Sequence, residues 1–323
     1  MGELNRLLIT GAAGFIGRAT VAEARARGQE VIAVIRSTAP ADWQEDAGIE
    51  TLHCDLSQDT CVPDLAEAMR RCDAVIHAAA HLGGDSSALG SDTLVATRNL
   101  LRARPEGLPL VLVSSITVYD TDLKAPGALI DEDTPLFAPG TAPDGYANAK
   151  LAQEALCREA GGPLWILRPG AVWGKGRSWN ALIGVALGPL VLRIDSGGEL
   201  PLTHVSQTAS TLVNAALTAP HGTTAVNILD DDRPTRARFC AAHGRETGWP
   251  RICLPMPWRL WAALARILAP VGPRLPGLLR LPSLRARVMP LRYSNAALRR
   301  AFGGADTAPF EEMLAQTLRE QTP

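Results

Sequence analysis

Short apolar runs alternate with longer segments of helical hydrophobic spacing along the first two-thirds of the chain. Short runs bounded by turn-forming residues are typical of parallel strands that are buried on both faces. Strands are predicted at residues 7–9, 30–35, 51–54, 73–80 and 110–113, and helices at residues 18–27, 62–71, 86–104 and 146–156. Repeated strand–helix units imply an α/β fold with a doubly wound parallel sheet, which binds ligands at the carboxyl ends of its strands.

The turn after the first predicted strand is rich in glycine, with the sequence Thr10-Gly11-Ala12-Ala13-Gly14-Phe15-Ile16-Gly17. Gly11 permits a tight turn, Gly14 lets the backbone approach a pyrophosphate, and Gly17 lets the helix pack close to the strand. The free N–H groups at the start of that helix would then face the phosphates. The loop therefore predicts a dinucleotide site, with an ordinary glycine turn before a helix as the alternative.

The end of the second predicted strand indicates which dinucleotide is bound. The strand at residues 30–35 is followed by Arg36 and Ser37, where this fold meets the adenosine ribose. An acidic residue there would bind the 2′-hydroxyl of NAD, whereas a guanidinium suits the 2′-phosphate of NADP. Arg36 therefore favours NADP over NAD, unless it is a solvated arginine at a strand end.

The catalytic signal combines a strand end with the start of a helix. Ser114 and Ser115 follow the fifth predicted strand, and Tyr146 and Lys150 stand four residues apart on the next predicted helix. Side chains at this spacing share one helix face. A lysine charge lowers the pKa of a nearby phenol, whose reference value is about 10. A serine can hold the oxygen of a carbonyl or hydroxyl group.

These features together resemble an extended short-chain dehydrogenase/reductase of the NAD(P)-dependent epimerase/dehydratase superfamily. The resemblance rests on GAAGFIG at 11–17, DL at 55–56, HAAA at 77–80, SSITVY at 114–119, YANAK at 146–150 and LRPGAVWG at 167–174. It implies a Rossmann-like sheet and a catalytic triad of Ser115, Tyr146 and Lys150, with Ser114 as the fallback serine.

The resemblance also implies where the cofactor lies. Asp55 and Leu56 would meet the adenine, Ala78 and Ala79 would approach the nicotinamide half, and Lys150 would bond the nicotinamide ribose. The expected cofactor-binding residues are Gly11, Ala13, Gly14, Phe15, Ile16, Gly17, Arg36, Ser37, Asp55, Leu56, Ala78, Ala79, Ala80, Tyr146, Lys150 and Pro169.

The chain departs from the family pattern at several positions. Thr93 stands where many relatives carry the asparagine of a proton relay, and His204-Val205-Ser206-Gln207 lacks the usual aspartate. Leu200 replaces an arginine that grips the diphosphate of nucleotide sugars in many relatives. A nucleotide-sugar substrate is therefore less favoured, although Arg285, Arg287 or Arg292 could provide such a grip.

Composition narrows the class of protein further. The 323 residues are 46% hydrophobic, and the formal net charge of −1 gives no general attraction to nucleic acid. The six cysteines form no CxxC pair or cluster at metal spacing, and no signal peptide precedes the first strand. We therefore expect a cytoplasmic enzyme with reduced thiols and no metal.

The C-terminal part is expected to hold the substrate specificity. We expect residues 1–177 to form the NADP-binding domain, with residues 204–230 returning to it as a helix at 205–219 and a strand at 225–229. Residues 178–203 and 231–323 would form a smaller substrate-binding lobe. A homodimer is expected only by analogy with relatives whose helices pair across an interface.

A strongly apolar helix is predicted at residues 258–269, too short to span a bilayer of about 20 apolar residues. Trp258, Trp261, Leu264 and Leu268 fall near one stripe of this helix. The helix could pack into the substrate lobe, form a lid over an apolar substrate, or contact a membrane surface or a partner. Arginines at 274, 280, 285, 287 and 292 follow it.

The predicted function is that of an NADP-dependent carbonyl reductase or alcohol dehydrogenase that acts on a hydrophobic or complex small molecule. A nucleotide-sugar epimerase or 4-ketoreductase is the alternative, and a non-catalytic NADP-sensing protein is a more remote one. A dehydratase usually needs a further acid and base beside the serine, where this chain has Ile116 and Thr117.

Overall fold

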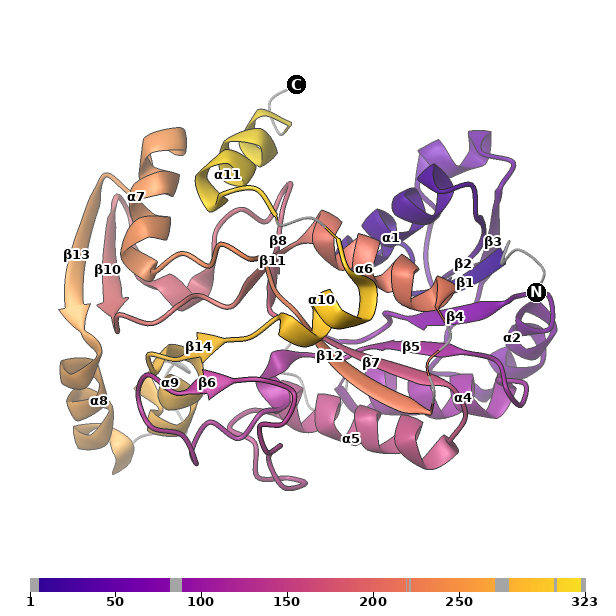
Figure 1. Cartoon of the computed structure of the whole chain (residues 1–323), viewed down its shortest axis with the longest axis horizontal. Coiled ribbons are helices and arrows are strands. Elements are labelled where there is room, and N and C mark those ends of the chain that lie inside the picture. The colour runs from indigo at the N-terminus through magenta and orange to yellow at the C-terminus, as the bar shows by residue number, and fades with distance from the viewer. Residues whose placement is uncertain are drawn as a thin grey trace.

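The computed structural model describes residues 6–81, 89–218, 220, 222–270, 279–304 and 307–320. Seven parallel strands form its main sheet, in the order β12-β7-β5-β4-β1-β2-β3 (Figure 1). The strands are β1 (Arg6–Thr10), β2 (Glu30–Ile35), β3 (Ile49–His53), β4 (Ala74–His77), β5 (Leu110–Val113), β7 (Leu164–Pro169) and β12 (Thr223–Ile228). The doubly wound parallel sheet expected from the apolar runs is confirmed.

Helices cover both faces of this sheet. They are α1 (Phe15–Ala26), α2 (Val62–Met69), α4 (Ala96–Ala103), α5 (Gly145–Ala160) and α6 (Val205–Leu217). Alternate strand residues form two cores, one packed against α1 and α6 and the other against α2, α4 and α5. Because both faces are buried, the central strands β2 and β5 are almost entirely apolar, whereas the edge strand β3 alternates with polar residues.

Some predicted boundaries differ from the observed ones. The strand expected at residues 73–80 ends at His77, because its neighbour β1 ends at Thr10, the partner of His77 in the register. Residues 78–80 leave the sheet as a loop. Residues 82–88, the start of the helix predicted at 86–104, lie outside the described ranges. The rest of that helix is a π-helical segment, η3 (Gly90–Val95), followed by α4.

Small sheets and short helices pack beyond the carboxyl ends of the main strands. A three-stranded sheet of β9 (Gly184–Leu187), β10 (Leu190–Asp195) and β13 (Ile252–Pro257) lies at the opposite end of the molecule from β3 (Figure 1). Two strand pairs, β8 (Ala171–Trp173) with β11 (Leu202–His204) and β6 (Leu129–Ile130) with β14 (Arg292–Tyr293), lie between the two sheets.

The helices of this part are α7 (Arg236–Thr247), α8 (Trp258–Ile267), α9 (Leu281–Val288), α10 (Ala296–Phe302) and α11 (Phe310–Arg319). Short 3-10 helices occur at η1 (Ala41–Glu45), η2 (Asp59–Cys61), η4 (Ile116–Val118) and η5 (Ala181–Ile183). Within the described ranges, no helix combines the length and apolarity that a bilayer crossing requires.

Helix α8 packs on the protein through Trp258 and Trp261 of the predicted stripe but not through Leu264. Trp261, Ala262 and Ala265 are buried against Ile194 and α9. Leu264, expected on the same stripe, is 40% exposed. The stripe prediction is therefore wrong for Leu264, because the helix packs through its Trp261–Ala265 side and leaves its aliphatic side open.

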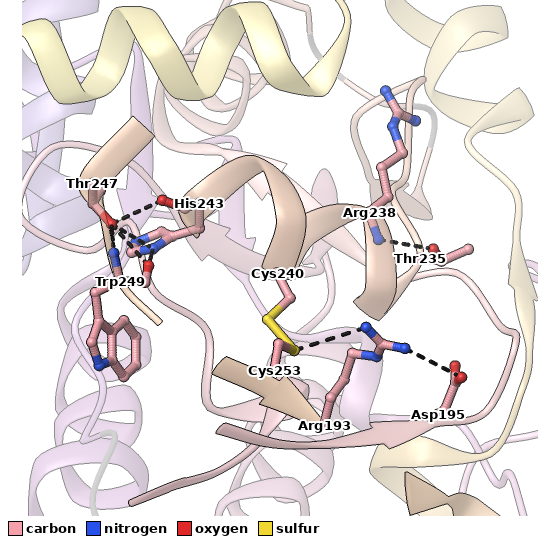
Figure 2. Close-up of a disulfide and its surroundings, with 9 residues drawn as sticks. All are labelled: Arg193, Asp195, Thr235, Arg238, Cys240, His243, Thr247, Trp249 and Cys253. Carbon is pink, nitrogen blue, oxygen red and sulfur yellow. Dashed lines mark hydrogen bonds and ion pairs between the residues drawn. A yellow bond between two sulfur atoms is a disulfide. The ribbon is translucent and has the colours of Figure 1, made fainter. Parts of the chain in front are cut away.

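Cys240 on α7 and Cys253 on β13 form a disulfide (Figure 2). The expectation that all six cysteines are reduced is therefore wrong for this pair. The packing of α7 against β10, the neighbour of β13, brings the two residues together across 13 positions of sequence. The other cysteines, Cys54, Cys61, Cys72 and Cys157, are free thiols.

Candidate functional site

A cavity of about 780 Å³ lies at the carboxyl ends of the main strands. Its walls come from the first glycine loop, the ends of β2, β4 and β5, the start of α5, and elements of the C-terminal part. All of the residues predicted from the sequence to bind the cofactor, and Ser115 with them, line this one cavity. Long-range folding therefore brings together side chains that are more than a hundred residues apart in the chain.

The glycine loop has the close backbone contacts that its sequence predicts. Gly11 has a φ of +65°, and a Cβ there would stand 2.8 Å from the amide nitrogen of Ala79. A Cβ at Gly17 would lie 2.1 Å from the carbonyl oxygen of Gly11. At Gly14, the residue before α1, an added Cβ would meet only that same oxygen, at 3.1 Å. The loop thus holds the open N-terminus of α1 against the cavity, where backbone N–H groups attract anions.

Arg36 lies at the cavity wall after β2 and is paired with an acid. Its Nη1 is 3.0 Å from Oδ2 of Asp92 in η3, and the Arg36 side chain is 63% exposed. The hydrogen bond and charge of Asp92 raise the pKa of Arg36 further, so the guanidinium is fully charged. A phosphate bound to Arg36 would have to share its guanidinium with Asp92 or displace the Asp92 carboxylate from it.

The two serines at the end of β5 have different surroundings. Both serines line the cavity, but the Ser114 hydroxyl donates to Oε1 of the buried Glu154 at 2.5 Å. The Ser115 hydroxyl accepts from the Thr117 hydroxyl at 3.1 Å and forms a side-chain hydrogen bond with Tyr146. This arrangement favours Ser115 over Ser114 as the serine that faces a reacting group.

Tyr146 and Lys150 lie on the first turns of α5. Asp144 caps this helix by accepting from the Ala147 N–H at 2.9 Å. The Lys150 Nζ lies 6.0 Å from the centre of the Tyr146 ring. Burial raises the pKa of Tyr146, and the hydrogen bond with Ser115 acts in the opposite direction. Burial lowers the pKa of Lys150 to about 8.

A chain of buried hydrogen bonds extends from Lys150 beneath the cavity. Lys150 Nζ donates to Oε1 of Gln153 at 2.8 Å, and Gln153 Nε2 donates to the Thr97 hydroxyl at 2.8 Å. Thr97 also contacts Nε2 of His77 at 2.9 Å, and Nδ1 of His77 contacts Thr10 at 2.7 Å. Burial lowers the pKa of His77 to about 3, so this ring is neutral. Gln153 thus links the Lys150 ammonium to Thr97, and through it to His77.

Two further arginines line the cavity: Arg177, which the sequence did not single out, and Arg287, which it offered as a phosphate grip. Arg177 stacks on the glycine loop, with its Cζ 4.7 Å from the centre of the Phe15 ring. Arg287 on α9 is paired with Asp144, with 2.7 Å between Nη2 and Oδ2. The sequence around Arg177 gave no sign of a role in the cavity, apart from its nearness to the LRPGAVWG segment. Its contact with Phe15 joins two residues that are far apart in the sequence.

Several candidates lie away from the cavity. Leu200 is in the core, and His204 caps α6 while its Nε2 contacts Thr317 on α11 at 3.1 Å. Neither Arg285 nor Arg292 lines the cavity, and no described residue of α8 does. The idea that α8 forms a lid over this cavity is therefore wrong. In the described ranges, no group of three or more His, Cys, Asp or Glu side chains is arranged to hold a metal ion.

Comparison with known proteins places the chain among dinucleotide enzymes. Residues 7–210 match a model described as the NAD dependent epimerase/dehydratase family. A human relative, "Epimerase family protein SDR39U1", is 28% identical over 78% of this chain and 83% of its own length. A 4-hydroxy-2-methyl-3-oxo-4-farnesyl-3,4-dihydroquinoline-1-oxide ketoreductase of Stigmatella aurantiaca is 28% identical over 72% of this chain and 70% of its own length.

A solved structure supports the same fold. The terminal R domain from the myxalamid PKS-NRPS biosynthetic pathway superposes with a TM-score of 0.75 at 22% identity. The match covers 99% of this chain and 91% of the R domain. At this identity the likeness bears on the fold, and it extends over the C-terminal small sheets as well as the main sheet.

Proposed function

The chain belongs to the NAD dependent epimerase/dehydratase family, and on that premise we propose that it reduces a carbonyl group of a hydrophobic small molecule with NADPH. The family makes the chain an NAD(P)-dependent oxidoreductase or epimerase of the extended short-chain dehydrogenase type. One observation carries the proposal: Ser115, Tyr146 and Lys150 line the same cavity as the glycine loop and Arg36.

The residues around the glycine loop fit a dinucleotide. Gly14 leaves room for a pyrophosphate at the N-terminus of α1, and Arg36 presents a charged, exposed guanidinium at the ribose end. Asp55 and Leu56 line the same cavity. When bound, NADPH supplies the hydride to the substrate carbon.

The protein's own residues would supply the proton and hold the oxygen. Because burial raises the pKa of Tyr146, its phenol is protonated near neutral pH and can donate a proton to the developing alkoxide. Ser115 holds the same oxygen through its hydroxyl, while the Lys150 ammonium favours the phenolate left behind. The hydride adds to carbon and the Tyr146 proton adds to oxygen, so the carbonyl becomes an alcohol.

The rest of the cavity supports an apolar substrate. Its side chains outside the dinucleotide-binding set include Ile116, Ile130, Pro143, Val172, Leu182 and Tyr293. Leu200, at the position where many relatives grip a nucleotide diphosphate, is in the core and offers no charge. The similar protein of Stigmatella aurantiaca, which is named as a ketoreductase of a farnesylated quinoline oxide, is consistent with this substrate class.

A nucleotide-sugar epimerase is the second candidate, because Arg177 and Arg287 both line the cavity. Two guanidinium groups could bind a substrate diphosphate. Arg287 is already paired with Asp144, and Arg177 lies against the cofactor loop, which favours the reductase.

The proposal is tested by turnover with NADPH against hydrophobic ketones and nucleotide 4-ketosugars, with UDP-sugars in a parallel assay. Oxidation of NADPH in stoichiometric amounts with a hydrophobic ketone is the expected result. Isomerisation of a UDP-sugar without net cofactor consumption would replace the proposal with the epimerase. Dinucleotide binding without turnover on any of these substrates would contradict both.

We expect Arg36→Ala to weaken NADP binding about tenfold to a hundredfold and to leave NAD binding almost unchanged. The variant removes charge-assisted hydrogen bonds to the 2′-phosphate, each of about 1.5–3 kcal/mol. Calorimetric titration with both dinucleotides measures the effect. Arg18→Ala is the matched control, because Arg18 is exposed on α1 and does not line the cavity. Equal affinities for NADP and NAD in the parent protein would contradict the assignment.

We expect Arg177→Gln to weaken NADP and NAD binding by the same factor, about tenfold. Its guanidinium lies over Phe15 at the glycine loop, close to where both dinucleotides carry a pyrophosphate. Lys175→Gln is the control, since Lys175 is exposed in the same loop and does not line the cavity. If Arg177→Gln left both affinities intact, Arg177 would be available to a substrate instead, which favours the epimerase.

A further inference from the structure

One face of the β13-β10-β9 sheet is apolar and only partly covered. The register pairs Leu190 with Leu187 and Ile252, and Leu192 with Leu254, so these side chains lie on the same face. Ile194 and Met256, two residues further along, point to that face too and pack against α8. Helix α8 therefore covers one end of the face, and the rest stays open: Leu187, Ile252 and Leu254 are about half exposed, at 52%, 52% and 49%.

Helix α8 continues this apolar surface. Leu260, Leu264 and Ile267 stand at i, i+4 and i+7, on the side opposite the buried Trp261, Ala262 and Ala265. Their exposed fractions are 62%, 40% and 75%. We call Leu187, Ile252, Leu254, Leu260, Leu264 and Ile267 the apolar end face. It lies on the end of the molecule remote from the dinucleotide loop, around β13 and α8 in Figure 1.

The sequence segment that contains β13 and α8 carries charge of one sign only. Between Glu246 and Asp306 the sequence contains ten arginines and no Asp, Glu or Lys. The whole chain has 32 Lys and Arg against 33 Asp and Glu, so acidic residues outnumber basic ones in the remainder. Three of the ten, Arg251, Arg259 and Arg266, lie next to β13 or on α8, whereas Arg287 and Arg299 are paired with Asp144 and Asp231 elsewhere.

Arginines border the exposed side of α8. At about 100° per residue, Arg259 and Arg266 lie on one flank of the helix, between its buried and its exposed apolar sides. Arg251 precedes β13, and all three side chains are exposed. No described carboxylate lies within 4.0 Å of any of these three guanidinium groups. Their charge is therefore available to a ligand, and their long stems can extend along an apolar layer.

We propose that the apolar end face docks on an anionic membrane surface. Aliphatic side chains flanked by arginines suit the boundary between acyl chains and negatively charged headgroups. A second copy of the chain fits less well, because a two-fold contact would bring Arg251, Arg259 and Arg266 of both copies close together. The proposal is independent of the proposed reaction, since no described residue of α8 lines the cavity.

The test is co-sedimentation of the full chain with vesicles of phosphatidylcholine alone and of phosphatidylcholine mixed with phosphatidylglycerol. We expect binding to the mixed vesicles, weakened by salt, and much weaker binding to phosphatidylcholine. Leu260→Gln/Leu264→Gln and Arg259→Gln/Arg266→Gln should each lower the partition coefficient about tenfold or more. Melting temperature and NADP affinity, measured on every variant, show that the fold and the dinucleotide site are intact.

Two control variants change the same chemistry elsewhere. Leu123→Gln/Leu129→Gln removes leucines of similar exposure, 70% and 43%, and Arg70→Gln/Arg102→Gln removes the same charge from the surface of α2 and α4. Both controls should bind the mixed vesicles as the parent does. Absence of binding to the mixed vesicles overturns the proposal, as does equal loss in controls and test variants. A dimer in light scattering that Leu260→Gln/Leu264→Gln dissociates, with no vesicle binding, would make this face a self-association interface instead.

Discussion

Replacing Tyr146 with phenylalanine is expected to lower the turnover number for a carbonyl substrate about a hundredfold to ten-thousandfold. The change removes one hydroxyl, the proposed proton donor, and keeps the ring that lies near Lys150. Dinucleotide affinity should stay close to that of the parent, because the glycine loop and Lys150 remain. Steady-state turnover and calorimetric titration of NADP on the same preparation separate these two effects. Retention of most of the parent turnover would refute the role of Tyr146.

The neighbouring serines provide an internal comparison for this prediction. Ser115→Ala should also slow turnover, because Ser115 faces Tyr146 and would lose its hydrogen bond to the substrate oxygen. Ser114→Ala should mainly lower stability, since the Ser114 hydroxyl is engaged by Glu154. The opposite result, slow turnover in Ser114→Ala alone, would shift the catalytic serine by one position.

Glu154→Gln is expected to lower the free energy of unfolding by about 3–5 kcal/mol. Glu154 and Arg168 are both 2% exposed and form a two-pronged ion pair, with N–O distances of 2.7 and 2.9 Å. The amide would leave the Arg168 guanidinium buried without a compensating charge. Urea unfolding without dinucleotide measures the effect, because a bound ligand would itself stabilise the native state.

Two further variants define what the loss means. Glu159→Gln removes an exposed carboxylate from the same helix and should change the free energy of unfolding by no more than about 0.5 kcal/mol. Glu154→Gln/Arg168→Met removes both charges and should recover part of the loss, because no unpaired ion remains. If Glu154→Gln were as stable as the Glu159→Gln control, the buried pair would contribute little to stability.

The buried ion pair also bears on how the site is built. Arg168 Nη1 donates to the Tyr119 hydroxyl at 2.9 Å, and Tyr119 in turn donates to Asn227 at 2.7 Å. Glu154 accepts from Ser114, the residue before Ser115. The layer thus joins α5, which carries Tyr146, to the end of β5, which carries Ser115. A partial loss of turnover in Glu154→Gln at a temperature where it remains folded is therefore expected.

Much of the main sheet could be predicted from local sequence. Apolar runs such as those at residues 30–35 and 110–113 become strands because both faces of the sheet are covered, so no polar position interrupts them. The glycine loop was equally predictable, because the positive φ of Gly11 and the contact of Gly17 with the Gly11 carbonyl are local requirements. Tyr146 and Lys150 could be paired because helical spacing alone puts them on one face.

Contacts between segments that are far apart in the sequence could not be predicted from any comparable pattern. The sequence marked Arg36 as a phosphate ligand but not its ion pair with Asp92, 56 residues later. It left Ser114 and Ser115 as alternatives, and Glu154, 40 residues from Ser114, distinguishes their surroundings. The spacing of Cys240 and Cys253 in the sequence did not predict a disulfide. The packing of α7 on the small sheet brings the two residues together.

The sequence by itself therefore determined the strand–helix order, the dinucleotide loop and the spacing of the candidate catalytic side chains, because each depends on backbone geometry within a few residues. Only the tertiary structure decided which side of α8 is buried, because both sides are apolar. The exposed side carries Leu260, Leu264 and Ile267, and the buried side carries Trp261, Ala262 and Ala265. Hydrophobic periodicity cannot distinguish two apolar sides of one helix; the partner surface formed by Ile194 and α9 does so. The contact of Arg177 with Phe15 likewise depends on the tertiary structure, because the two residues are 162 positions apart in the sequence.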